Sequence, residues 1–158
     1  MLRLKHVFAG FAAGLFLFAL APTVASGSPA RSSEAGVLAA VNAARVSRGL
    51  HALRLDLTLR SAARSHSSDM LRRNYFAHGA FPTRMASFHV RGRMAGENLA
   101  WGSGQYGQAG TIIAEWLASP EHRANLLSSS FSRIGIGVAR GSFLGTAGAT
   151  IVTADFAG

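Results

Sequence analysis

Apolar side chains recur at steps of three and four residues in two segments of the chain, residues 32–49 and 56–74. This spacing is typical of one face of an α-helix. The repeating positions are Val37, Val41 and Ala44 in the first segment and Leu59, Ala63, His66 and Met70 in the second. Gly49 is expected to end the first helix, and Asp56 is expected to cap the start of the second. Both segments are therefore predicted to be amphipathic helices.

Two further helices are predicted in the second half of the chain. Residues 108–118 carry an apolar face with Ile112 or Ile113, Trp116 and Leu117. The run Ser119-Pro120-Glu121 then has the residue types of a helix start, namely a capping serine, a proline in the first turn and an acid near the N-terminus. It predicts a short helix over residues 120–127. Residues 75–93 show no sustained period and are predicted to form a loop with short turns.

The last part of the chain has the alternation of β-strands. "RIGIGVAR" at 133–140 places three branched apolar residues on one face and three small residues on the other. The small face indicates that another element packs closely against it. A glycine-rich turn separates this segment from a second strand at 149–156, so the two should form an antiparallel hairpin. Helices first and strands late predict an α+β fold with helices flanking a small antiparallel sheet.

The first 25 residues are predicted to be a secretory signal peptide. Basic residues stand at positions 3, 5 and 6, an uncharged run covers residues 7–21, and small residues follow up to Ala25. A membrane span needs about 20 apolar residues, so no transmembrane segment is expected once the signal is removed. Residues 26–32 are expected to be a short linker and residues 33–158 a single domain.

The predicted domain is basic and contains no cysteine. Residues 31–158 hold 14 arginines and no lysine against 7 acids. Without disulfides, an exported domain of this size must be held by its core or by a ligand. The arginines are scattered and no nucleic-acid motif accompanies them, so nucleic acid is not an expected partner. A secreted or cell-envelope protein that meets envelope lipid, a cell-wall polymer or a protein ligand is expected instead. The sequence does not indicate an oligomeric state.

Four polar residues could carry chemistry: His78, Glu97, Glu115 and His122. Two neutral imidazoles and a carboxylate can hold a zinc ion and leave a position for water. Alternatively, carboxylates and imidazoles in one pocket shift each other's pKa values and transfer protons. The four residues fall on different predicted elements, and no short motif such as H-E-x-x-H joins them. Their spacing alone favours ordinary surface or structural roles over a shared site.

Several motifs follow one another along about residues 35–156. They are "VNAAR" with "GLHALRLD", "LRSAARSHSSDMLRRNYFAH", "GENLAWG", "EWLASPEHRANLL", "FSRIGIGVA" and "VTADF". As a set they resemble the CAP superfamily, which includes cysteine-rich secretory proteins, venom antigens and plant pathogenesis-related proteins. The chain is most similar to the shorter bacterial branch. The resemblance implies a three-layer α-β-α sandwich with a cleft lined by two histidines and two acidic residues.

The resemblance assigns the cleft residues one by one. His78 matches the family's first histidine, Glu97 its first glutamate and His122 its second histidine. The second glutamate of many eukaryotic members falls on Ser119, and Glu115, one helical turn earlier on the same face, is the acid that can replace it. A divalent ion, zinc first, is then expected on His78 and His122 together with Glu97.

Two functions remain open at this point, and the sequence does not decide whether the protein is an enzyme. The first is an exported binding module for an envelope lipid, glycan or protein, with or without a metal ion. The second is a peptidase-like, metal-dependent hydrolase in which Glu97, and Glu115 as a second acid, serve as catalytic residues. Serine peptidase chemistry through Ser119 and His122 ranks third because no third group orients the histidine. We rank binding first because the family's fourth cleft position is altered.

Overall fold

The computed structural model describes residues 32–158. The predicted signal peptide, residues 1–25, and all but the last residue of the predicted linker, residues 26–32, lie outside the described residues. The elements are α1 (Glu34–Val46), β1 (Arg54–Leu55), α2 (Leu57–Arg73), α3 (Phe81–Ser87), β2 (Ala95–Ser103), a 3₁₀ turn (Gly104–Gly107), α4 (Ala109–Ala118), α5 (Pro120–Leu126), β3 (Arg133–Phe143) and β4 (Thr146–Ala157).

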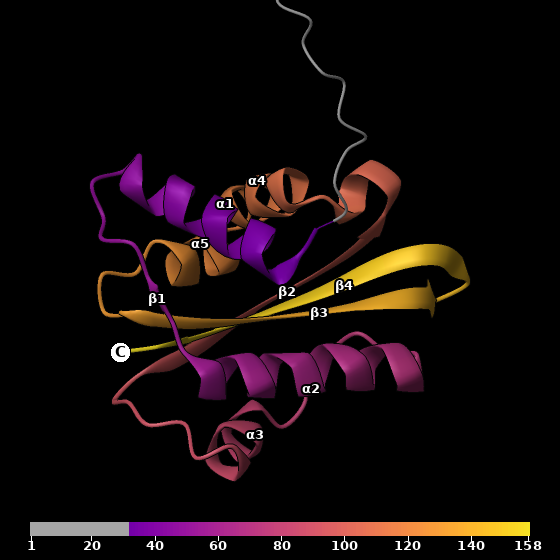
Figure 1. Ribbon diagram of the computed structural model, residues 1–158, viewed down its shortest axis with the longest axis horizontal. Helices are drawn as coiled ribbons and strands as arrows, with labels where there is room; N and C mark the ends of the chain where they lie inside the picture. Colours follow the sequence, from indigo (N-terminus) through magenta and orange to yellow (C-terminus); the bar gives the residue numbers. More distant parts are fainter. Residues whose placement is uncertain (1–31) are drawn as a thin grey trace, which may run out of the picture.

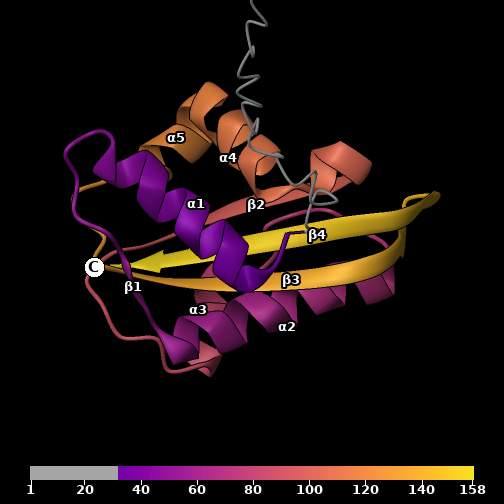
Figure 2. The ribbon, with the colours of Figure 1, turned by 45° about the horizontal axis from the view of Figure 1, so that its top comes forward.

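A four-stranded sheet with the order β1-β3-β4-β2 separates two layers of helices. Helices α1, α4 and α5 cover one face, and α2 with α3 covers the other (Figures 1 and 2). The predicted α-β-α sandwich and the predicted β3–β4 hairpin are therefore confirmed. The expectation of a purely antiparallel sheet is wrong, because the short strand β1 pairs in parallel with β3. Helices α2, α3, α4 and α5 and strand β2 separate β1 from β3 in the chain, so these two strands are not joined by a hairpin turn.

The small-residue face of β3 is where α2 packs. A Cβ atom on Gly135 would collide with the backbone of Leu59, and one on Gly137 would collide with the backbone of Ala63. Glycine at these positions lets the helix approach the sheet more closely than a side chain would allow. The close packing predicted from the alternation of "RIGIGVAR" is thus present.

Apolar side chains are buried on both faces of the sheet. The larger cluster joins α1, α4 and α5 to the strands, with Val41, Trp116, Ile134 and Phe156 among its members. Two smaller clusters lie between the sheet, α2 and α3. All buried members of the three clusters fall between residues 37 and 157. Residues 32–158 therefore contain a complete core of their own.

Besides the two-residue strand β1 and the 3₁₀ turn, helix α3 and strand β2 were missing from the sequence prediction. Residues 75–93, predicted to be loop, contain α3, a helix of only 7 residues with proline in its first turn. A helix this short cannot show a repeating apolar face. Strand β2 did not alternate because Glu97, Asn98, Leu99 and Ala100 are all buried, with neighbours on both faces. Within residues 32–158 no helix is long and apolar enough to span a membrane.

Candidate functional site

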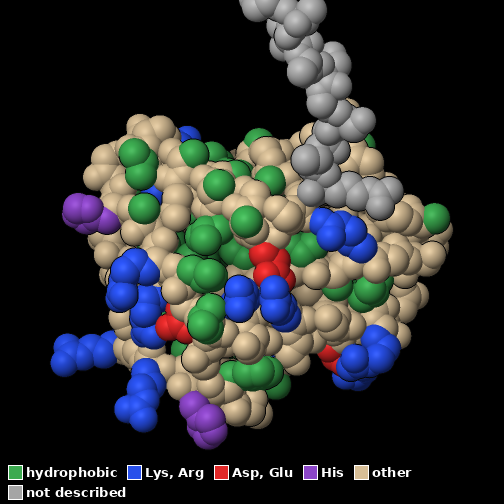
Figure 3. Space-filling model, in the orientation of Figure 1, with side chains coloured by type: hydrophobic (Ala, Val, Ile, Leu, Met, Phe, Trp, Pro, Cys, Tyr) green, Lys and Arg blue, Asp and Glu red, His purple; other side chains and the backbone are tan. Residues whose placement is uncertain are grey.

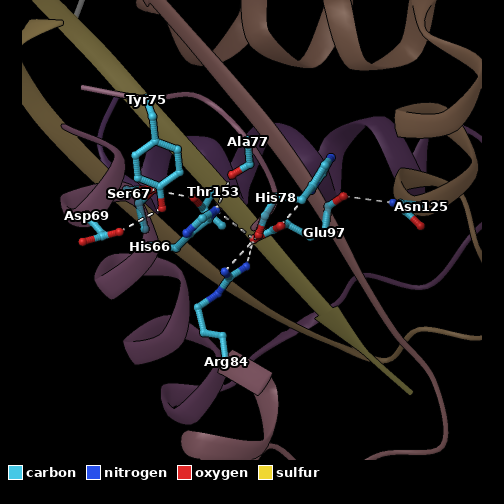
Figure 4. Close-up of polar contacts among 11 residues, drawn as sticks. His66, Ser67, Asp69, Tyr75, Ala77, His78, Arg84, Glu97, Asn125 and Thr153 are labelled. Atoms are coloured by element: carbon cyan, nitrogen blue, oxygen red, sulfur yellow. Dashed lines mark hydrogen bonds and ion pairs between the residues drawn. The ribbon is translucent and has the colours of Figure 1, made fainter. Parts of the chain in front are cut away.

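Glu97 is the centre of a network of polar side chains (Figure 4). Its side chain is buried, and one carboxylate oxygen lies 2.7 Å from Nδ1 of His78. The other oxygen accepts a hydrogen bond from the guanidinium of Arg84. Nε2 of His66 is 3.8 Å from that same oxygen. The Glu97 carboxylate is therefore shared by two histidines and an arginine.

Three elements bring this network together. Strand β2 carries Glu97, α3 carries Arg84, and His78 lies in the turn between α2 and α3. Arg84 also donates to the backbone carbonyl of His78 at 3.2 Å, so a single guanidinium fixes both the glutamate and the turn. Charge-assisted bonds of this type are stronger than neutral ones. The arginine was not anticipated from the sequence, where it stood in the segment predicted to be loop.

Asp155 lies beside Glu97 on the neighbouring strand. The register of β2 and β4 pairs the two residues directly, so both side chains leave the sheet on the face covered by α2. Asp155 is fully buried, and no donor within residues 32–158 bonds to either of its oxygens. Burial, and then the negative charge of Glu97, raise the pKa of Asp155 to about 8. Asp155 thus keeps its proton at neutral pH and can donate it to Glu97.

His66 was predicted to be a packed core histidine, and its burial is confirmed. Its Nε2 lies 3.0 Å from the carbonyl oxygen of Ala77. Burial lowers the pKa of His66, while the nearby Glu97 opposes that shift. Asp155 and His66 could have been flagged from the sequence only as isolated titratable residues among apolar neighbours, which is a weak signal.

His122 lies on α5 and lines a hollow that does not include Glu97. Its Nδ1 lies 2.9 Å from Oγ of Ser119. Burial, followed by the charge of His78, lowers the pKa of His122, so the imidazole is neutral at physiological pH. No carboxylate within residues 32–158 bonds to the other ring nitrogen, so a Ser-His-acid triad is not assembled here.

Two asparagines connect the His122 side to the Glu97 side. Nδ2 of Asn98 donates to the backbone carbonyl of His122 at 2.9 Å. Nδ2 of Asn125 donates to the backbone carbonyl of Glu97 at 3.1 Å and to Oδ1 of Asn98 at 3.0 Å. The start of α5 is thereby tied to β2, which fixes His122 relative to the strand that carries Glu97.

Glu115 belongs with His122 rather than with Glu97. It is exposed on α4 and lines a hollow of about 340 Å³ that we call the His122 cleft. The residues of this cleft are Phe76, Leu99, Ala100, Trp101, Glu115, Trp116, Ser119 and His122. Ser119, which occupies the place of the family's second acid, contributes a hydroxyl to the same cleft. Of the four predicted residues, His78 and Glu97 contact each other directly, and Glu115 and His122 share the cleft.

The predicted metal ligands do not form a three-ligand centre in this arrangement. Both oxygens of Glu97 are engaged, one by His78 and the other by Arg84. Across residues 32–158, no three histidine, aspartate or glutamate side chains are grouped to hold an ion. Zinc sites use three or four protein ligands, more than these side chains supply in the arrangement described here. Metal binding stays a prediction.

A family model supplies the decisive comparison. The model described as "CAP: Cysteine-rich secretory protein family" matches residues 38–156 of this chain. The chain belongs to this family. The matched range contains every strand except the last residue of β4, together with all of the cleft and network residues named above. The resemblance drawn from the sequence motifs is therefore confirmed.

Similar proteins occur in Bacillus subtilis strain 168. The uncharacterized protein YkwD is 36% identical over 121 residues, which are 73% of this chain and 46% of that protein. The uncharacterized membrane protein YlbC is 36% identical over 114 residues, 69% of this chain and 32% of that protein. The chain thus spans between a third and half of the length of these curated relatives.

Solved structures show the same fold. An extracellular protein containing an SCP domain from Bacillus anthracis is 29% identical, with a TM-score of 0.65 over 77% of this chain and 38% of that chain. An outer surface protein of Borrelia burgdorferi is 20% identical, with a TM-score of 0.60 over 75% of this chain and 88% of that chain. These two relatives are an extracellular and a surface protein.

Proposed function

We propose that this CAP-domain protein is an exported binding module whose His122 cleft takes a glycan of the cell envelope. The observation that carries the proposal is the composition of the cleft, where aromatic rings stand beside a few polar groups. Phe76 is 40% exposed and Trp101 is half-buried, while Glu115, Ser119 and His122 supply hydrogen-bonding atoms. Binding sites for small molecules combine apolar walls with a small number of placed polar groups.

Two of the three aromatic walls, Trp101 and Trp116, are held in place by neighbouring residues, which favours recognition of a rigid ring. Trp101 packs edge-on against Phe143 with ring centres 5.3 Å apart. Nε1 of Trp116 donates to the carbonyl of Leu99 at 2.9 Å. A sugar ring presents C–H groups that can pack on such aromatic faces, and its hydroxyls can bond to the carboxylate and imidazole. Little side-chain entropy is lost on binding because the walls are already ordered.

The test is calorimetric titration of residues 32–158 with soluble disaccharide-peptide fragments of peptidoglycan. Phe76→Ala is expected to weaken binding about fivefold, since an aromatic contact contributes on the order of 1 kcal/mol. Glu115→Gln and His122→Ala are expected to weaken it as well. Tyr106→Ala is the matched control, because Tyr106 is 57% exposed on the 3₁₀ turn and does not line the cleft. Failure of the wild type to bind any fragment, or an equal loss in the control, would refute the proposal.

Export is part of the proposal and is supported by two observations. The N-terminal 25 residues have the charge and hydropathy pattern of a signal peptide. The similar Bacillus anthracis protein is described as extracellular, and the Borrelia protein as an outer surface protein. Expression of the full chain in a bacterial host, followed by N-terminal sequencing of the protein outside the cytoplasm, is expected to find cleavage near Ala25. An uncleaved cytoplasmic product would contradict it.

A metal-dependent hydrolase is the second candidate, and one observation keeps it open. His78 and His122 are near enough for the first to lower the pKa of the second, and a neutral imidazole is the form that binds metal. Zinc titration of residues 32–158 tests this candidate. The wild type is compared with four variants: His78→Ala, His122→Ala, Glu97→Ala and Glu115→Ala. Stoichiometric binding that both histidine variants lose would support a metal centre. No binding by the wild type would remove the hydrolase and leave glycan recognition unaffected.

A further inference from the structure

One end of the sheet carries arginines from three separate parts of the chain. Arg54 of β1 is paired in register with Arg133 of β3. The guanidinium of Arg133 donates to the carbonyl of Arg91, and the backbone N–H of Arg93 donates to Gly158 just after β4. These contacts hold four arginines at this end of the sheet, where they form a surface that we call the arginine edge of the molecule. Figure 3 shows basic side chains gathered on that side of the molecule, where β1 lies in Figure 1.

The charge of this edge is almost uncompensated. Arg54, Arg91 and Arg93 are exposed, and none of them forms an ion pair with another residue of the described range 32–158. Arg133 forms an ion pair with Asp56 at 2.7 Å, and this pair compensates one of the four charges. The edge therefore attracts anions, and the attraction falls off within about 10 Å at ordinary salt.

Large apolar side chains are exposed among these arginines. Leu55 is 45% exposed, Leu57 is 61% exposed and Met94 is 52% exposed. Leu55 follows Arg54 in the chain, Met94 follows Arg93, and Leu57 follows Asp56, the partner of Arg133. A soluble polyanion would use the arginines and leave these side chains in water. A lipid bilayer satisfies both, because phosphate headgroups meet the arginines and the acyl boundary takes the apolar side chains.

We propose that the edge formed by Arg54, Arg91, Arg93 and Arg133 with Leu55, Leu57 and Met94 docks the protein on an anionic phospholipid bilayer. This edge is separate from the His122 cleft and does not depend on what that cleft binds. Strand β2 connects this edge with the Glu97 network, because Met94 precedes Glu97 by three residues, a distance of about 10 Å along a strand. Docking places the Glu97 network close to the membrane surface.

The test is sedimentation of residues 32–158 with vesicles of phosphatidylcholine containing phosphatidylglycerol. A triple variant, Arg54→Gln, Arg91→Gln and Arg93→Gln, is compared with a control triple variant, Arg72→Gln, Arg73→Gln and Arg140→Gln. Both remove the same charge, and the control residues stand at the far end of α2 and seven residues along β3 from Arg133. Each arginine near a membrane contributes about fivefold, so the edge variant is expected to lose on the order of 100-fold and the control less than about fivefold.

Two further measurements distinguish a bilayer from a soluble polyanion. High salt removes most of the charge attraction, because the screening length falls from about 10 Å at 0.1 M to about 3 Å at 1 M. The double variant Leu57→Gln with Met94→Gln is expected to abolish the vesicle binding that survives in 0.5 M salt. The same pair is expected to leave binding to soluble polyphosphate unchanged. His122→Ala is expected to bind vesicles as the wild type does.

Three results would overturn the proposal. Equal losses in the edge and control variants would mean that total charge, not this edge, governs binding. Binding to polyphosphate as tight as binding to vesicles, with no effect of Leu57→Gln and Met94→Gln on either, would identify a polyanion surface. Equal binding to vesicles of phosphatidylcholine alone would remove the role of the arginines. Urea unfolding of each variant, expected to match the wild type, shows that lost binding is not lost folding.

Discussion

Replacing Asp155 by asparagine tests whether a neutral acid lies beneath the Glu97 network. Burial and the charge of Glu97 raise the pKa of Asp155 from its ordinary 3.8 to about 8. The folded protein therefore holds a proton that the unfolded chain releases, so the stability contributed by this group is greatest below pH 3.8 and is lost as pH rises toward 8. Each pH unit in that range corresponds to about 1.4 kcal/mol. Between pH 4 and pH 7 the wild type should lose at most about 4 kcal/mol through Asp155.

Urea unfolding followed by tryptophan fluorescence at pH 4 to 9 measures this loss. The stability of Asp155→Asn minus that of the wild type is expected to increase by several kcal/mol between pH 4 and pH 7, then to level off above about pH 8. Asp155→Ala is the control: it also removes the titrating group but leaves a small cavity, so it should show the same pH trend at lower stability. Curves that run parallel to the wild type would show that Asp155 is ionised in the folded protein and would refute the reasoning.

Two further predictions concern packing and buried charge, and both are checked by urea unfolding. Gly137→Ala is expected to destabilise the fold by more than about 3 kcal/mol, because its Cβ would collide with the backbone of Ala63. Gly141→Ala meets only the flexible side chain of Leu71, at 3.2 Å, and should cost far less; equal effects would contradict the packing argument. Arg45→Met should cost about 3 kcal/mol, because buried Arg45 donates to the carbonyls of His51, Leu126 and Ser128. A neutral outcome would mean that water replaces the guanidinium there.

The predicted helices and the hairpin were accessible from the sequence because their signals are local. Helices α1, α2 and α4 each repeat an apolar face over ten residues or more, and β3 alternates along its length. The start of α5 was predicted from Ser119, Pro120 and Glu121 without any tertiary contact, although the serine hydroxyl bonds to His122 and does not cap the helix. Helix α3 and strand β2 were missed because one is too short for a period and the other is buried on both faces.

The residues of the candidate site also fall into those that local motifs identified and those that only tertiary packing brought together. Family motifs pointed to His78, Glu97 and His122, and the structure places His78 against Glu97. Arg84 and Asp155 were not foreseen, since one reaches Glu97 from a helix that the sequence pattern concealed and the other from a strand 58 positions later in the chain. No spacing rule connects residues that meet only through strand pairing and helix packing.

By itself, the sequence determined which segments are amphipathic, where most helices begin and end, that the domain is basic, and to which family it belongs. Those properties depend on neighbouring residues or on the composition of the whole chain. Only the tertiary structure decided that Glu97 is engaged by an arginine, that a buried aspartic acid lies beside it, and that four distant arginines share one edge. These arrangements arise from register and packing, where the free energy of burial sets which side chains meet and how each one titrates.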